Sequence, residues 1–219
     1  AIQFAFTGGS AQDPANKPGV ANFAASMLDE GAGDLDSNAY HERLERRAIQ
    51  LNFNVTRDYV RGSVKMLKEN SDEAFDLLRL ALTSARFDDE PMVRIRSQLV
   101  SIVRRSSTNP NSIAHRTFWN SAYPGHPYAH DTTGTLESLP TIEAADLKAY
   151  TQRVFARDNL KIAVVGDIDA AQVGKLLDVA FGKLPAKAQL TPVPDVDFVK
   201  TPKQIFLPLD VPQTALMFG

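Results

Sequence analysis

Histidine is the first residue type to consider for metal chemistry, because the 219-residue chain contains no cysteine. That absence excludes disulfides, cysteine-ligated zinc, iron–sulfur clusters and thiol catalysis, so a metal site would have to use His, Asp or Glu. His126 and His130, followed by Asp131, have a spacing that could bind a metal. They lie in a loop rich in Pro and Gly without a defined third ligand, so we favour a packing role for them. The other two histidines, His41 and His115, do not complete a metalloprotease helix motif.

The remaining reactive residue types lack the spacing that their chemistry requires. The serines do not sit in the Gly-flanked elbow of a nucleophile, and the glycine turns at 8–10 and 31–33 do not match a phosphate-binding loop. Four acidic residues between 29 and 36 lack the alternation of a calcium loop and predict a solvated turn. Four arginines between 94 and 105 predict a solvated helix face rather than an anion site. The residues alone therefore predict an α+β module without visible catalytic machinery.

Composition excludes two further classes of function. The net charge is -2, with both signs spread along the chain, so there is no basic surface to hold nucleic acid. The longest apolar runs, such as 162–165, are far shorter than the roughly 20 residues of a membrane-spanning helix. The chain starts directly on a strand-like segment, without Met, and stops in another, so we expect it to begin and end within a longer protein.

The pattern of apolar residues predicts an α+β fold, a two-layer antiparallel sheet covered by helices. Alternating segments predict strands at 1–6, 50–56, 59–67 and 160–165, which we expect to share one largely antiparallel sheet. Helical spacing predicts helices over 20–29, 37–47, 74–85, 91–106, 111–122, 142–155 and 170–181. Asp36 or Ser37 is expected to cap the second of these, and Asn70 with Glu73 predicts a capping box before the third.

The predicted domain organisation rests on a cluster of prolines near the end of the chain. The segment between 183 and 202 contains four prolines, which is the composition of a semi-rigid linker. We therefore predict one domain over 1–188, a linker over 189–202, and the first strands of a second, truncated domain over 203–219. The predicted strands there are Lys203 to Leu207 and Gln213 to Phe218.

Four segments in a fixed order resemble the insulinase or pitrilysin type of zinc metallopeptidase, the group that includes mitochondrial processing peptidase. They are GGSAQDPANKPGVANFAASMLDEGAG (8–33), ALTSARFDDEPMVRIRSQL (81–99), HPYAHDTTGTLESL (126–139), and LKIAVVGDID (160–169) leading into FGKLP (181–185). The resemblance covers almost the whole chain and implies a LuxS/processing-peptidase-like fold.

Active members of that family carry His-x-x-Glu-His on the first buried helix, in which two histidines bind zinc and the Glu activates water. The resemblance places Asn22 and Ser26 at the histidine positions and Ala25 at the position of the catalytic Glu. The third ligand, a Glu on a later helix, falls near Ile102. These side chains supply neither a strong zinc donor nor a general base. The resemblance therefore implies an inactive half that has no catalytic residue and binds neither metal nor cofactor.

The resemblance also implies a role for such a half. The family builds a clamshell from repeated domains, and only one of them carries zinc. We therefore expect a non-catalytic subunit or domain of a heterodimeric metallopeptidase, inactive by itself, that contributes to the peptide-binding chamber of an active, zinc-bearing partner in proteolysis. Substrate contacts of the usual kind would lie beyond Gly219. Exported family members suggest the bacterial periplasm. The alternative is a scaffold or binding protein without a role in proteolysis.

Overall fold

The sheet is the part of the fold that positions everything else. In a computed structural model of the chain, which describes residues 1–196 and 203–219, four strands form it: β1 (Ile2–Thr7), β2 (Gln50–Val55), β3 (Tyr59–Lys65) and β4 (Leu160–Val164). Their order is β2-β3-β1-β4 and every neighbouring pair is antiparallel. The prediction that these four segments share one antiparallel sheet is confirmed, and so is the α+β fold class.

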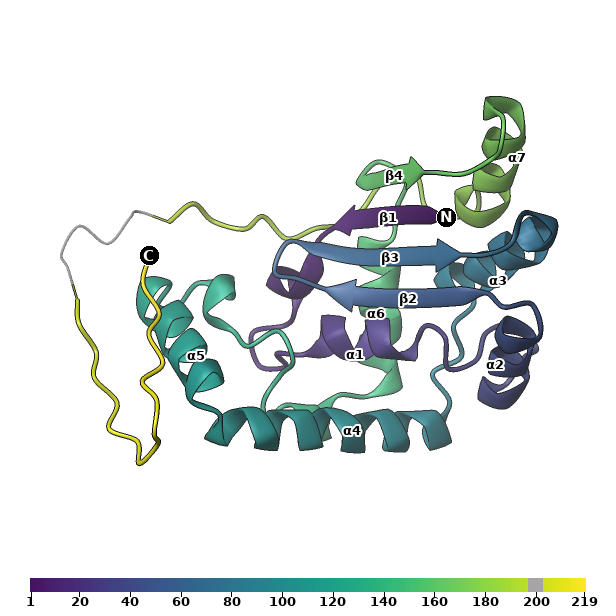
Figure 1. Ribbon diagram of the computed structural model, residues 1–219. Coiled ribbons are helices and arrows are strands. Elements are labelled where there is room, and N and C mark those ends of the chain that lie inside the picture. The colour runs from purple at the N-terminus through teal and green to yellow at the C-terminus, as the bar shows by residue number, and fades with distance from the viewer. Residues whose placement is uncertain (197–202) are drawn as a thin grey trace.

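Helices cover one face of the sheet. They are α1 (Val20–Met27), α2 (Ser37–Arg46), α3 (Ser71–Thr83), α4 (Asp89–Thr108), α5 (Pro110–Ala122), α6 (Ala144–Val154) and α7 (Ala170–Phe181). Short 3-10 turns lie at η1 (Gly9–Gln12), η2 (Lys68–Asn70), η3 (Pro127–Ala129) and η4 (Leu139–Thr141). Helix α1 packs against β2, α6 and α4, so it is enclosed between the sheet and the outer helices (Figure 1). Among the described residues, none of the helices combines the length and apolar character needed to cross a membrane.

Alternation along the strands explains why only one face is covered. Ile2, Phe4 and Phe6 of β1 are buried, whereas Gln3 and Thr7 are exposed and Ala5 is half-buried. Gly62 of β3 stands opposite Phe4, and a Cβ atom at this position would come within 2.0 Å of the Phe4 ring. The glycine therefore makes room for the aromatic ring on the covered face. The opposite face of the sheet carries polar side chains and is open.

The capping box predicted before α3 is not formed. Helix α3 begins at Ser71, and Asn70 makes no side-chain capping bond; it instead donates its amide to the Arg47 carbonyl at 2.9 Å. Glu73 pairs with Arg47 at 2.7 Å, so contacts with the preceding helix replace the predicted capping box. Asp36, by contrast, does cap α2 by accepting a bond from the Ala39 amide.

The predicted strands near the C-terminus are also absent from the described structure. Residues 203–219 contain no assigned strand and are almost entirely exposed, because among the described residues they have no neighbouring strand with which to pair. Residues 197–202 of the predicted linker lie outside the described residues. The division into a first domain, a linker and a second domain stays a prediction.

Candidate functional site

Helix α1 carries the three sequence positions at which catalysis was considered. Its apolar residues recur at helical spacing and are buried: Val20, Ala21, Phe23, Ala24, Ala25 and Met27. The helix begins after Gly19, whose φ of 99° lies in the left-handed region that suits glycine. Asp13 holds this end of the helix, because its two carboxylate oxygens accept bonds from the Gly19 and Ala21 amides, each at 2.7 Å. The helix position is therefore fixed from both the core and its N-terminal end.

Asn22 and Ser26 lie one turn apart at the half-buried surface of α1. The Ser26 hydroxyl donates to the Asn22 carbonyl at 2.9 Å, so its proton is used within the helix itself. Ile102 lies on α4, which packs against α1, and its side chain is 45% exposed. An amide, a hydroxyl and an aliphatic chain do not form a zinc site. Among the described residues there is no group of three His, Asp or Glu placed to hold a metal ion.

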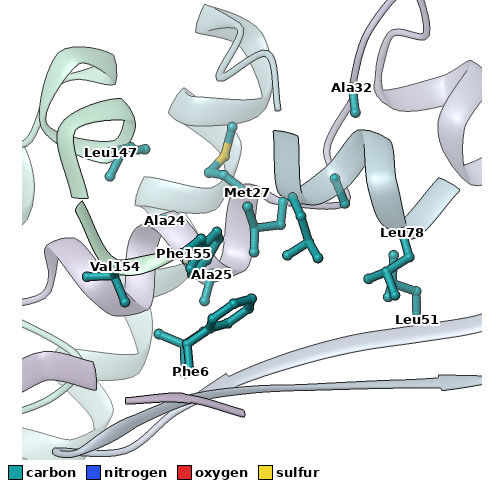
Figure 2. Close-up of a cluster of buried hydrophobic side chains, with 14 of the residues drawn as sticks. Phe6, Ala24, Ala25, Met27, Ala32, Leu51, Leu78, Leu147, Val154 and Phe155 are labelled. Atoms are coloured by element: carbon teal, nitrogen blue, oxygen red, sulfur yellow. The ribbon is translucent and has the colours of Figure 1, made fainter. Parts of the chain in front are cut away.

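Ala25 occupies a different environment from Asn22 and Ser26 on α1. It is 4% exposed and belongs to the hydrophobic cluster that also contains Phe6 of the sheet and Phe155 after α6 (Figure 2). The rings of Phe6 and Phe155 stack with their centroids 4.7 Å apart. The position that the resemblance assigns to a catalytic Glu is therefore part of the apolar core. These residues do not fit a zinc ion with an activated water.

One of the four acidic residues of the turn after α1, Glu30, is a buried anchor, whereas Asp34 and Asp36 are exposed, as expected for a solvated turn. Glu30, with a side chain only 7% exposed, accepts a bond from the Ser37 hydroxyl at 2.6 Å and pairs with the Arg94 guanidinium. The pKa of the Glu30 carboxyl is lowered by these bonds, which outweigh the opposing effect of burial. Arg96 donates to the Ile142 carbonyl at 2.7 Å. Two of the four arginines on α4 therefore bind the protein itself.

The histidine loop packs against the protein, as its composition predicted. His126 is 7% exposed, its Nδ1 accepts a bond from the Tyr128 amide at 3.0 Å, and its Nε2 lies 2.9 Å from the Pro194 carbonyl. Because one nitrogen accepts and the other must donate, both positions of the neutral ring are used. Burial and the nearby His126 lower the pKa of His130. This arrangement leaves His126 without a nitrogen for a metal.

Asp13 was missed by the sequence analysis, and its electrostatics give a testable pH dependence. Burial raises the pKa of its carboxyl to about 7, although the Ala21 and Gly19 amides and the charge of Arg153 act in the opposite direction. An aspartate in the unfolded chain titrates near pH 3.9. Between these values the folded protein binds more protons than the unfolded chain, so the free energy of unfolding falls as pH rises.

We therefore expect Asp13→Asn to remove part of this pH dependence. The Asn side chain does not titrate, so the stability of the wild type relative to the variant should decrease as pH rises from 4 to 7. The slope of that difference is at most about 1.4 kcal/mol per pH unit. Urea unfolding of both proteins at pH 5 and pH 7 measures it. Equal pH slopes in the two proteins, or a wild type that gains relative stability with rising pH, would contradict the assignment.

Two sequence profiles match the chain consecutively. Insulinase (Peptidase family M16) matches residues 1–136, and Peptidase M16 inactive domain matches residues 141–219. The first match covers more than half of the chain and includes the degenerate positions on α1 and α4. The second begins just before α6 and includes the exposed C-terminal residues.

Individual relatives agree with these profiles. The chain is 28% identical over all its 219 residues to the non-peptidase homolog YmxG of Helicobacter pylori, of which it spans 50%. It is 25% identical over 179 residues, 82% of its length, to cytochrome b-c1 complex subunit 1 of Caenorhabditis elegans, of which it spans 38%. A crystal structure of a peptidase M16 inactive domain from Pseudomonas fluorescens superposes with a TM-score of 0.82 at 27% identity, covering 88% of this chain and 47% of that one.

Proposed function

This chain belongs to the insulinase family of peptidases, family M16, and on that premise we propose that it forms a non-catalytic wall of a peptide chamber. It is an M16 domain of the inactive type, homologous to non-peptidase YmxG-like proteins. The active site of the proposed assembly belongs to a partner of the same fold that carries the zinc motif. The substrate of the assembly is a peptide, and this chain contributes surface rather than chemistry.

The observation that carries this proposal is the contrast between a complete fold and an absent catalytic set. The core from the sheet to α1 is closely packed, with Phe23, Ala24 and Met27 each 0% exposed. At the same time Asn22, Ala25 and Ser26 provide no zinc donor or general base. A fold that is closely packed although the three ligand positions and the position of the catalytic Glu lack suitable side chains can still act through its shape and surface. A chamber wall is such a role.

The sheet offers a surface that suits an extended peptide. Strand β2 is at the edge of the sheet and pairs only with β3, so its outer side has unpaired backbone groups among the described residues. Asn52 and Asn54 of β2 are exposed, and α1 packs against the same strand. An extended peptide can add to such an edge by backbone hydrogen bonds, which tolerate many sequences. This edge is the part of the surface that we assign to peptide contact.

A second candidate function is a structural subunit without any role in proteolysis. The similarity to a subunit of the cytochrome b-c1 complex of Caenorhabditis elegans favours it. Both candidates require a protein partner, so binding to a partner does not separate them. They differ in whether the assembly with a motif-bearing peptidase turns over peptide faster than that peptidase alone.

The zinc content of the chain and of its assembly tests the proposed division of roles. We expect well below one zinc per chain in elemental analysis of protein purified without chelators, because the donors are absent. When the full-length chain is co-purified with a motif-bearing M16 protein encoded beside it, we expect a 1:1 complex with one zinc, held by the partner. One zinc per chain in the isolated protein would refute the proposal, as would the absence of any complex.

A further inference from the structure

The segment that leaves the first domain, residues 185–194, follows a defined path over the protein surface. We call it the strap. It runs from the end of α7 past the end of β1 toward the side on which α5 lies (Figure 1). Most of its side chains are exposed, and Leu190 packs at the edge of the core. Its proline content predicts a semi-rigid linker. Whether it can move relative to the first domain depends on the hydrogen bonds that its backbone makes.

The centre of the strap is held by the side-chain amide of Gln12 in η1. Gln12 donates from Nε2 to the Thr191 carbonyl at 2.9 Å, and its Oε1 accepts from the Thr191 amide at 2.7 Å. This pair reproduces the two bonds that a neighbouring strand would make to one residue. Gln12 is 5% exposed, and its own carbonyl accepts a bond from Arg153 at 2.9 Å. Gln12, which holds the strap, is therefore itself held in place.

Contacts on both sides of Thr191 extend the attachment. Toward the start of the strap, the Gln189 amide donates to the Arg153 carbonyl at 2.8 Å and the Ala188 amide donates to Asp158 at 2.9 Å. Before them, the Pro185 carbonyl accepts from the Arg157 amide at 2.9 Å. Toward its end, the Pro194 carbonyl lies 2.9 Å from His126 Nε2.

These contacts share one property: every strap group that they use is a backbone amide or carbonyl. The partner groups come from η1, the end of α6, the residues after α6 and the histidine loop, and they lie up to 179 residues from the strap in sequence. The prolines of the strap carry no amide that would need a partner. A backbone that is held at five of its ten residues, the first and the last among them, has little freedom to pivot.

We propose that the strap is a permanently docked part of the first domain and fixes the direction in which the rest of the protein leaves it. The functional boundary then lies beyond Pro194 rather than at Ala188, and any movement of downstream residues relative to the sheet starts after Pro194. Gln12 is the residue that positions the strap. Because Asp13 follows Gln12 and caps α1, the strap also shares its anchor with the helix that carries the degenerate positions. This inference does not rest on the proposed function.

Residue-resolved amide hydrogen exchange tests the proposal directly. In the unmodified chain, we expect the amides of Ala188, Gln189 and Thr191 to exchange at least tenfold more slowly than that of Val193, which has no acceptor among the described residues. Gln12→Ala should accelerate exchange at Thr191 at least tenfold. Thr191 exchanging as fast as Val193 in the unmodified chain would overturn the proposal.

A milder variant and a distance measurement keep the test decisive if Gln12→Ala unfolds the protein. Asp158→Ala alters an exposed side chain and should accelerate exchange at Ala188 while Thr191 stays protected. The chain has no native cysteine, so spin labels at Lys161→Cys on the sheet and Thr191→Cys in the strap, both exposed positions, report one distance without background. We expect a single narrow distance distribution. A broad distribution in the otherwise unmodified chain, or loss of protection throughout the strap in Asp158→Ala, would overturn the proposal.

Discussion

Replacing Ala25 with Glu is expected to lower the free energy of unfolding at pH 7 by about 3 kcal/mol or more. Ala25 is 4% exposed in the core cluster with Phe6 and Phe155, and no cationic side chain belongs to that cluster. A carboxylate there loses its hydration without gaining a partner, and the larger side chain also overpacks the site. Urea unfolding of the variant and the wild type gives the difference.

Asn22→Glu is the matched control for this experiment. It adds the same carboxylate to the same helix at a half-buried position in the first turn, where the helix dipole favours a negative charge. Burial raises the pKa of a Glu at position 25 above the value of about 4.3 in the unfolded chain, so the penalty should shrink as pH falls toward 4. Equal unfolding midpoints for the two variants at pH 7 would contradict the core assignment of Ala25.

The second large effect concerns the assembly. Adding the full-length chain to its motif-bearing partner is expected to raise peptide turnover at least tenfold, because a second wall orients the peptide and excludes water from the active site. Residues 1–219 alone should have a smaller effect, since the chain spans half the length of its Helicobacter pylori relative. This chain adds no catalytic group, so the gain comes from positioning.

The sheet was predictable because its strands follow simple rules. Alternation in segments such as Leu51, Phe53 and Val55 marks a half-buried strand, and that pattern survives in the structure. The helix carrying Asn22 was predictable from the spacing of Phe23, Ala24 and Met27. In both cases the information lies within a few neighbouring residues, where periodicity reports burial.

The features that the sequence analysis missed depend on contacts between distant residues. Glu30 looked like part of a solvated turn, but Arg94, 64 residues away, makes it a buried anchor. Asn70 and Glu73 have the spacing of a capping box. In the structure, however, Asn70 donates to the Arg47 carbonyl and Glu73 forms an ion pair with the Arg47 side chain. The attachment of the strap to Gln12 spans 179 residues and uses backbone groups of the strap, which leave no signature in residue type.

The positions of the family's zinc motif also divide into what residue types can predict and what only the structure shows. The prediction that Asn22 and Ser26 stand at the zinc-ligand positions follows from comparing residue types with the family motif, and no coordinates are needed for it. The burial of Ala25 within the core does require them, because the residue type alone does not show what surrounds an alanine in the folded chain. The structure therefore adds a reason why the catalytic carboxylate cannot simply be put back.

We propose that this chain supports a peptidase partner by its shape rather than by chemistry, and a turnover assay of the assembly tests this proposal. Peptide cleavage is measured for the motif-bearing partner alone, with the full-length chain, and with the full-length chain carrying Asn22→Ala and Ser26→Ala. We expect both forms of the chain to raise turnover at least tenfold and to the same extent, because neither side chain takes part in the reaction. Turnover that stays at the level of the partner alone, or stimulation that is lost in the double variant, would contradict it.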